Sequence, residues 1–221
     1  MDYDGFLELV KKRRSNRSFK PDPIPDDYAD KIIEAARWAP SGFNTQPWDF
    51  AVVKKQELKD SIVQLLEEKG GVPRRPMDYS NAPVFIILLG DPRTKIGLPP
   101  RLSTDYERNQ PIYISSLASA FLSMHLAATA LGLASQWMTH AGFQVQVSIK
   151  ELLGVPEGFE IYDMMAVGYP AVKARPKPVR AWEKMVHYDY SSKEDFRTDE
   201  EVNDFAGRTR DWMYAGLRRP D

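Results

Sequence analysis

The sequence contains no cysteine, and this absence excludes several chemistries at once. Disulfides, thiolate nucleophiles and cysteine-held zinc or iron–sulfur centres are all ruled out. The three histidines, His125, His140 and His187, are far apart and form no helical i, i+4 pair, so we expect no metal site. If the chain is an enzyme, a bound cofactor is the expected source of its chemistry.

Other common signatures are also missing. The sequence has neither glycine-rich loop that cradles phosphate, G-x-G-x-x-G or G-x-x-x-x-G-K-[ST], and no G-x-S-x-G elbow of a serine hydrolase. The 30 basic and 31 acidic residues give a net charge of -1, so we expect no nucleic-acid or membrane partner. The beginning of the chain resembles no secretory signal, and its uninterrupted apolar runs, such as residues 84–89, are too short to span a bilayer. These features fit a cytoplasmic protein.

The pattern along the chain predicts one sizeable core with a small appendage. Loosely alternating helices and strands indicate an α+β or α/β domain of three layers. We expect Asp26 or Asp27 to cap the second helix, and we expect loops at residues 70–82 and 91–111. Residues 191–221 are read as a peripheral tail, partly helical around 199–214. The predicted helices are 3–13, 28–38, 56–69, 112–131 and 147–153, and the predicted strands are 48–53, 83–89, 134–139 and 162–167.

Residues 112–131 form the most apolar predicted helix. A helix that is apolar nearly all round must be buried centrally or against a partner subunit, and its small residues would allow close approach. We expect His125 to be a hydrogen-bonded core or interface residue and His187 to be a surface residue. Trp38 and Trp48 are expected in the core or at an interface.

Three motifs stand in a fixed order. Arg13-Arg14-Ser15-Asn16-Arg17 places three guanidiniums and a hydroxyl where a helix ends, and such a group can grip a phosphate. Residues 39–48, A-P-S-G-F-N-T-Q-P-W, offer a hydroxyl, two carboxamides and an aromatic ring on a loop. Residues 166–170, A-V-G-Y-P, precede a basic segment that contains Lys177 and Arg180.

Together these motifs make residues 5–190 resemble the nitroreductase superfamily. The family pattern is R-R-S-x-R-x-F, then A-P-S-x-x-N-x-Q-P-W, then G-Y-P with basic residues. The resemblance implies an α+β three-layer sandwich with a central, mostly antiparallel sheet flanked by helices, and an intertwined homodimer with FMN at the subunit interface. It implies an FMN-binding domain over 1–190 and a C-terminal extension over 191–221 that wraps the partner subunit.

The resemblance also assigns roles to residues. Arg13, Arg14 and Ser15 would hold the phosphate or ribityl chain, Arg14 partly through its backbone, and Arg17 would reach the flavin pyrimidine. Pro40, Ser41, Gly42 and Asn44 would contact the same flavin from the partner subunit. Arg180 is the expected late phosphate ligand, with Lys177 as the alternative. The stretch over the flavin N5 edge would be residues 136–142, which include Gln136, Trp137, Met138 and Thr139. Thr139 or Gly142 could hydrogen-bond the flavin N5 there. If Trp137 does not touch the flavin, it is expected in the core.

The implied activity is an FMN-dependent oxidoreductase that takes hydride from NAD(P)H and reduces a nitroaromatic, a quinone or another conjugated acceptor with ping-pong kinetics. Tyr106 is the best candidate for a side chain that faces the substrate. One alternative is a dehalogenating branch that resembles iodotyrosine deiodinase. The glutamate, tyrosine and lysine of that branch's lid cannot be matched here, and the basic loops suggest an anionic substrate instead. The other alternative is a non-catalytic flavin-binding protein, or one whose Arg13–Arg17 segment contacts RNA.

Overall fold

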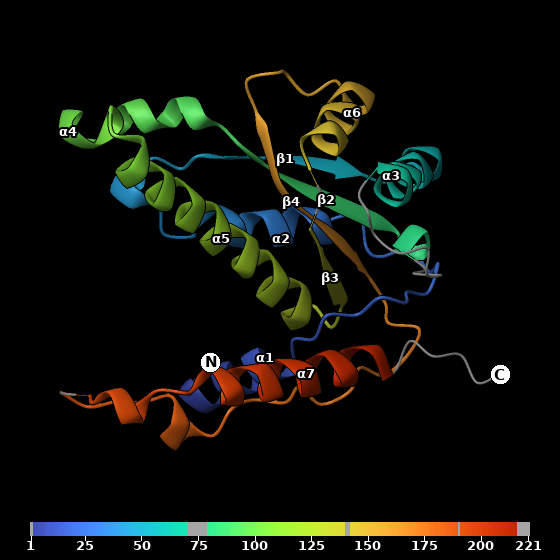
Figure 1. The fold of residues 1–221 in the computed structure, drawn as a ribbon. Coiled ribbons are helices and arrows are strands. Elements are labelled where there is room, and N and C mark those ends of the chain that lie inside the picture. Colours follow the sequence, from blue (N-terminus) through green and yellow to red (C-terminus); the bar gives the residue numbers. More distant parts are fainter. Residues whose placement is uncertain (1, 70–78, 140–141, 190, 216–221) are drawn as a thin grey trace. The chain divides into compact units, whose positions relative to one another are not determined.

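The computed structural model describes residues 2–69, 79–139, 142–189 and 191–215 (Figure 1). The chain divides into two compact units, residues 1–174 and residues 175–221, and each is described by itself. The family resemblance implies a different division, with an FMN-binding domain that ends at residue 190. That division stays a prediction.

The first unit contains the sheet and most of the helices. Its strands and α-helices match the expected elements closely, with short 3-10 turns between them. In chain order the elements are α1 (Tyr3–Lys12), α2 (Tyr28–Arg37), η1 (Gly42–Asn44), β1 (Trp48–Val53), α3 (Gln56–Lys69), η2 (Tyr79–Asn81), β2 (Val84–Gly90), η3 (Pro92–Gly97), α4 (Pro100–Ser103), α5 (Tyr106–Ala130), β3 (Ala134–Met138), α6 (Phe143–Leu153) and β4 (Glu160–Gly168).

The four strands form one sheet in the order β1-β2-β4-β3, and every neighbouring pair is antiparallel. Strand β2 is buried along its whole length at the centre of the sheet. The register of β2 with β4 shifts once, between Leu88 and Leu89. The antiparallel sheet flanked by helices confirms the predicted α+β class.

Two hydrophobic cores make the domain three layers thick (Figure 1). Because side chains of a strand alternate between faces, β2 supplies both cores. Ile86 and Leu88 face helices α2 and α5, whereas Phe85 and Ile87 face helices α3 and α6. The buried Lys59 of α3 donates from Nζ to the carbonyl of Ala82 at 2.6 Å, which ties this helix to the start of β2.

Helix α5 begins at Tyr106 rather than at 112, and the predicted loop 91–111 is wrong over much of its length, because it contains η3, α4 and the first residues of α5. Asp105 caps the helix by accepting from the Arg108 backbone N–H at 3.2 Å. Pro111 lies in the second turn, where it removes one helical hydrogen bond, and the tertiary contacts of Tyr113 and Leu117 outweigh that cost. By length and composition α5 could also span a membrane, yet nearly half of its apolar window is buried within this unit, as in a core helix.

Three further expectations need correction or fall outside the described residues. Asp27 stands at the N-cap position of α2 but makes no capping hydrogen bond; its carboxylate pairs with Lys31 at 2.7 Å. Helix α6 begins at Phe143 rather than at 147, with Val145 and Ile149 buried one turn apart. The predicted loop at 70–82 lies mostly outside the described residues, as does His140.

The second unit contains α7 (Asp199–Ala215) and two 3-10 turns, η4 (Trp182–Lys184) and η5 (Lys193–Asp195). The expected helix around 199–214 is confirmed. Ser192 and Asp195 form a reciprocal capping box at η5. His187 is exposed, as expected, and its ring stacks on Phe196 with centroids 4.8 Å apart.

Candidate functional site

The Arg13–Arg17 segment begins where α1 ends and then runs beside the edge strand β3. The Arg13 backbone N–H donates to the Leu9 carbonyl at 3.2 Å and closes the last turn of α1. Two residues later Ser15 forms a parallel bridge with Ser135, and the Asn16 N–H donates to the Ser135 carbonyl at 3.0 Å. The structure thus brings the first predicted binding motif to Ser135, the residue that precedes Gln136 in β3 and lies far away in sequence.

The three arginines of this segment have different surroundings. Arg13 is half-buried, and burial together with the neighbouring charge of Arg14 lowers the pKa of its guanidinium. Arg14 turns back on α1 and donates from Nη1 to the carbonyl of Arg13 at 2.8 Å and to that of Lys11. These bonds occupy one end of its guanidinium, and the role expected for Arg14 at the phosphate stays a prediction.

Arg17 is fixed by a tyrosine that was expected only in a lid-like loop. The Tyr79 hydroxyl is hydrogen-bonded to Arg17, and burial raises the pKa of that hydroxyl although the Arg17 charge opposes the rise. A neutral phenol that accepts from a guanidinium leaves the positive charge of Arg17 intact for an anion.

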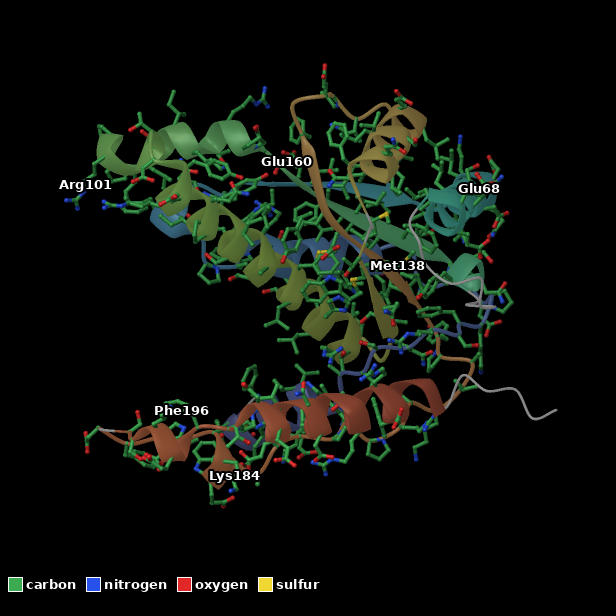
Figure 2. The ribbon with its side chains drawn as sticks, in the orientation of Figure 1. Glu68, Arg101, Met138, Glu160, Lys184 and Phe196 are labelled. Carbon is green, nitrogen blue, oxygen red and sulfur yellow. The ribbon has the colours of Figure 1, made fainter. Side chains whose placement is uncertain are left out.

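Strand β3 presents its residues to both cores. Trp137 is partly buried and packs on the α5 side, whereas Met138 is buried on the α6 side. Gln136 is buried and donates from Nε2 to the Trp137 carbonyl at 2.6 Å, but its Oε1 has no hydrogen-bond partner. Thr139 is exposed just beyond the strand, and Gly142 precedes α6 with a φ of 85°. Met138 is labelled at the end of β3 in Figure 2.

The loop that contains Pro40, Ser41, Gly42 and Asn44 is built under backbone strain. Among the described residues four that are not glycine have a positive φ, and Phe43, Asn44 and Gln46 of this loop are three of them. Such conformations cost free energy and persist only where neighbouring contacts impose them. Here the Gly42 N–H donates to the Ser116 Oγ of α5 at 3.0 Å, and the Gln46 N–H donates to the Ser41 Oγ at 3.1 Å.

Within one chain this loop and the arginine segment lie at different points along α5. The loop contacts α5 at Ser116, whereas the charge of Arg13 acts on His125, nine positions further along the helix. At a rise of 1.5 Å per residue this corresponds to about 13 Å along the helix axis. The two motifs are therefore adjacent to the same helix without forming one compact cluster in a single chain.

The remaining predicted residues lie elsewhere. Lys177 and Arg180 belong to the second unit, where Arg180 donates to the Lys184 carbonyl and lines a cavity of about 350 Å³. Tyr106 is exposed in the first turn of α5, with the Lys95 ammonium 5.5 Å from its ring centroid. The same ammonium lies 4.5 Å from the ring centroid of Tyr113. The Tyr113 hydroxyl bonds Glu160, which Figure 2 labels at the start of β4.

Sequence reasoning missed a buried polar contact behind β3. His125 and Ser135 are each 1% exposed, and His125 Nδ1 lies 2.7 Å from Ser135 Oγ. The imidazole stacks on Trp137 with an interplanar angle of 14°. Burial, aided by the Arg13 charge, lowers the pKa of His125 to about 4. The expectation of a hydrogen-bonded core histidine is confirmed; its partner could not be found from sequence, because only the tertiary fold brings α5 and β3 together.

The site as a whole can bind an anion beside a strand edge. Three guanidiniums gather on one segment, and one buried amide oxygen is left for a donor group. In the part of the chain that the structure describes, no group of three histidine or carboxylate side chains could hold a metal ion. The class defined by the fold is thus an antiparallel α+β sandwich, and the anion site on its arginine segment stays a prediction.

The chain belongs to the nitroreductase family, since the model of that family matches residues 10–169. A protein of Archaeoglobus fulgidus with the provisional name NADH dehydrogenase/NAD(P)H nitroreductase is 29% identical over 165 residues, which cover 74% of this chain and 84% of that protein. Iodotyrosine deiodinase of Drosophila melanogaster is 30% identical over 185 residues, which cover 74% of this chain and 61% of the fly protein.

A solved structure of similar fold is an FMN-dependent nitroreductase from Clostridium difficile. It superposes with a TM-score of 0.67 at 26% identity and covers 84% of this chain and 99% of its own. The likeness therefore extends over nearly the whole of the bacterial protein, which agrees with the family assignment.

Proposed function

We propose that this chain is an FMN-dependent oxidoreductase that takes hydride from NAD(P)H and reduces an electron-poor aromatic or conjugated acceptor, such as a nitroaromatic or a quinone. The observation that carries the proposal is the pairing of Ser15 and Asn16 with Ser135, which places the arginine segment beside the predicted N5-edge segment. Membership of the nitroreductase family and the likeness to the FMN-dependent enzyme of Clostridium difficile support it.

The residues present fit FMN on two counts. The segment Arg13–Arg17 supplies side-chain cations and a hydroxyl for a phosphate, which replaces the glycine-rich loop that the sequence lacks. The buried and unpartnered Gln136 Oε1 is the kind of atom that a bound molecule satisfies. In this proposal Arg13 and Ser15 hold the phosphate and ribityl chain, and the late phosphate contact by Arg180 or Lys177 stays a prediction from the family resemblance.

When bound, FMN supplies the acceptance and donation of hydride. The protein then has to bind, orient and polarise. Arg17, held by Tyr79, would place a positive charge at the pyrimidine edge and stabilise negative charge there. Thr139 or the backbone at Gly142 would donate a hydrogen bond at the N5 edge. None of these roles needs a side chain that acts as a general acid or base.

A homodimer completes the proposed site. Pro40, Ser41, Gly42 and Asn44 would contact the cofactor held by the other subunit, which accords with their distance from the arginine segment within one chain. Helix α5 has the exposed apolar residues that such an interface requires, Ile114 at 40% and Leu122 at 49%. Trp38 is 81% exposed in the single chain, so its expected place in the core is wrong and only the interface alternative stays open.

The proposal is tested by an absorbance spectrum of the purified protein, by reconstitution with FMN, and by stopped-flow reduction with NADH and NADPH. We expect a yellow protein whose absorbance near the flavin maximum bleaches with at least one of the two nicotinamides. Product formation with a nitroaromatic or a quinone should follow ping-pong kinetics. A colourless protein that binds no FMN on reconstitution would refute the proposal.

A second candidate activity is reductive dehalogenation of an aromatic substrate. The specific observation in its favour is the likeness to iodotyrosine deiodinases, among them a 64-residue match to the rat enzyme at 45% identity that covers 22% of that enzyme. Of the charged residues in the two basic loops, Arg74, Arg75 and Asp78 lie outside the described residues. Arg108 is engaged by Asp105 at 3.1 Å, and Arg101, which is exposed, is labelled in Figure 2.

Parallel assays of the reduced enzyme separate the two candidates. Halotyrosines and nitroaromatics are offered under anaerobic conditions, and halide release and nitro-group reduction are measured. Release of halide at a rate well above that of nitroaromatic reduction would assign the chain to the dehalogenating branch.

A further inference from the structure

Asn16 differs from its neighbours in the arginine segment because its side chain is buried. It is 5% exposed, whereas Ser15 is exposed and the arginines are partly exposed. Its Oδ1 accepts from the Ser18 N–H at 3.0 Å, and its Nδ2 donates to the Val172 carbonyl at 3.2 Å. The side chain therefore points into the protein and joins the segment to the chain that follows β4.

The backbone around Asn16 is held from the other side by β3. The Asn16 N–H donates to the Ser135 carbonyl at 3.0 Å, and the Ala171 N–H donates to the Ser18 carbonyl at 3.0 Å. Asn16 thus joins the arginine segment to two distant parts of the sheet. A loop fixed at its fourth residue holds the side chains on either side of that residue in defined directions.

Ser135 is in turn fixed by His125. Its Oγ lies 2.7 Å from the imidazole Nδ1, both residues are buried, and the imidazole packs on the rings of Phe121 and Trp137. The contact joins α5 to the same residue of β3 that accepts from Asn16. A continuous path of hydrogen bonds therefore runs from α5 through Ser135 to the arginine segment.

From this geometry we infer that Asn16 and His125 are positioning residues for phosphate recognition: they hold the guanidinium of Arg13 in place without touching the ligand. Groups that orient the ligating side chains of a site often matter nearly as much as those side chains. The inference rests on the proposed binding of FMN. This role differs from a general structural role in one respect. Substitution of either residue should weaken the binding of the cofactor's phosphate and leave the binding of its ring system unchanged.

The test compares FMN with riboflavin, which has the same ring system and ribityl chain but no phosphate. Dissociation constants for the full-length apoprotein are measured by quenching of flavin fluorescence, and thermal melting confirms folding. The variants are Asn16→Ala, with Asn16→Ser as a milder change, and His125→Leu beside His125→Asn. Asparagine can place a polar atom near the position of Nδ1, so it should keep the contact with Ser135. Asn203→Ala, at an exposed position of α7, is the matched control.

We expect Asn16→Ala and His125→Leu to weaken FMN binding about tenfold, which is the effect of weakening one charge-assisted hydrogen bond. The dissociation constant of riboflavin should change by less than about twofold, because riboflavin has no phosphate to make this contact. His125→Asn should recover most of the FMN affinity, and Asn203→Ala should change neither constant. If riboflavin binds the wild type too weakly to measure, the readout is the salt dependence of FMN binding, which should decrease in both variants.

Two results would overturn the inference while leaving the proposed function intact. One is an equal loss of FMN and riboflavin affinity in the variants, or an unchanged salt dependence, which indicates general damage to the pocket. The other is unchanged FMN affinity in folded Asn16→Ala or Asn16→Ser protein. Failure of the wild-type protein to bind FMN is a distinct result, and it would refute the proposed function itself.

Discussion

Gly42 is a position where the strained loop 40–46 has no room for a side chain. A Cβ built on this residue would lie 2.1 Å from Cγ2 of Ile112, a branched atom close to the backbone of α5. The donation from the Gly42 N–H to Ser116 holds the loop against the helix at this point. The close approach of loop and helix is therefore what allows Phe43 and Asn44 to keep their unfavourable φ values.

We expect Gly42→Ala to destabilise the fold by about 1–3 kcal/mol, the usual cost of overpacking. The free energy of unfolding from denaturant titration provides the measurement. The double variant Gly42→Ala with Ile112→Ala should recover part of this loss when it is compared with Ile112→Ala alone. Equal stability of Gly42→Ala and the wild type would show that the loop moves freely away from α5.

At the scale of single residues, the sequence indicated which kind of ligand a residue suits, but not which residue it contacts in the fold. The pattern of Arg13–Arg17 predicts an anion site only together with the two later motifs, because a run of arginines alone is more often a solvated surface. It could not show that Arg14 turns back on α1 or that Tyr79 bonds Arg17, since both depend on how the backbone leaves the helix. It also left Asn16 as an unassigned member of the motif, although this residue is the one that is buried.

Helix α5 and strand β3 are joined by a histidine that stays neutral. The pKa of His125 is lowered from 6.5 to about 4, chiefly by burial and also by the charge of Arg13. Between these two values the unfolded chain binds a proton that the folded chain excludes. Stability from this residue is therefore complete above about pH 6.5 and is lost as the pH falls toward 4.

We expect acidification from pH 7 to 4.5 to cost about 2 kcal/mol through His125 alone, by linkage from the two pKa values. The His125→Asn variant lacks this proton-binding group, so its free energy of unfolding should fall by correspondingly less over the same range. Denaturant titrations of both proteins at the two pH values give the comparison. An equal loss of unfolding free energy in the two proteins would mean that folding does not lower the pKa of His125.

For whole elements, hydrophobic patterning predicted β1 and β2 and the body of α5. It failed where local chemistry and tertiary contact disagree. The prolines of residues 91–111 indicated a loop, but Asp105 caps a helix that tolerates Pro111 near its start. Asp27 was expected to cap α2, and instead it forms an ion pair with Lys31. Neither outcome could be found without knowing what packs on each helix.

For the whole molecule the open question is the predicted homodimer. The exposed Leu122 offers a test because it lies outside the core of the first unit. We expect Leu122→Glu to shift the mass measured by light scattering from about twice 25.3 kDa toward 25.3 kDa, since a carboxylate is costly in an apolar interface. FMN affinity should fall in parallel, because the loop 40–44 of the other subunit would be lost.

The matched control is Leu152→Glu, a leucine on α6 that is 36% exposed. It should leave both the mass and the FMN affinity unchanged. A Leu122→Glu protein that remains dimeric would place the interface elsewhere on the molecule. The predicted wrapping of the partner by residues 191–221 can be examined in the same assay with a chain that ends at residue 190.

The side-chain bond from Asn16 to Val172 joins positions separated by 156 residues. During synthesis the arginines leave the ribosome early, but the strand and the carbonyl that orient them are made only when the first unit is almost finished. Contacts of such separation form late because closing the intervening chain is entropically costly. A chain still under synthesis lacks the contacts that orient these arginines, so we expect FMN to bind only after the first unit has folded.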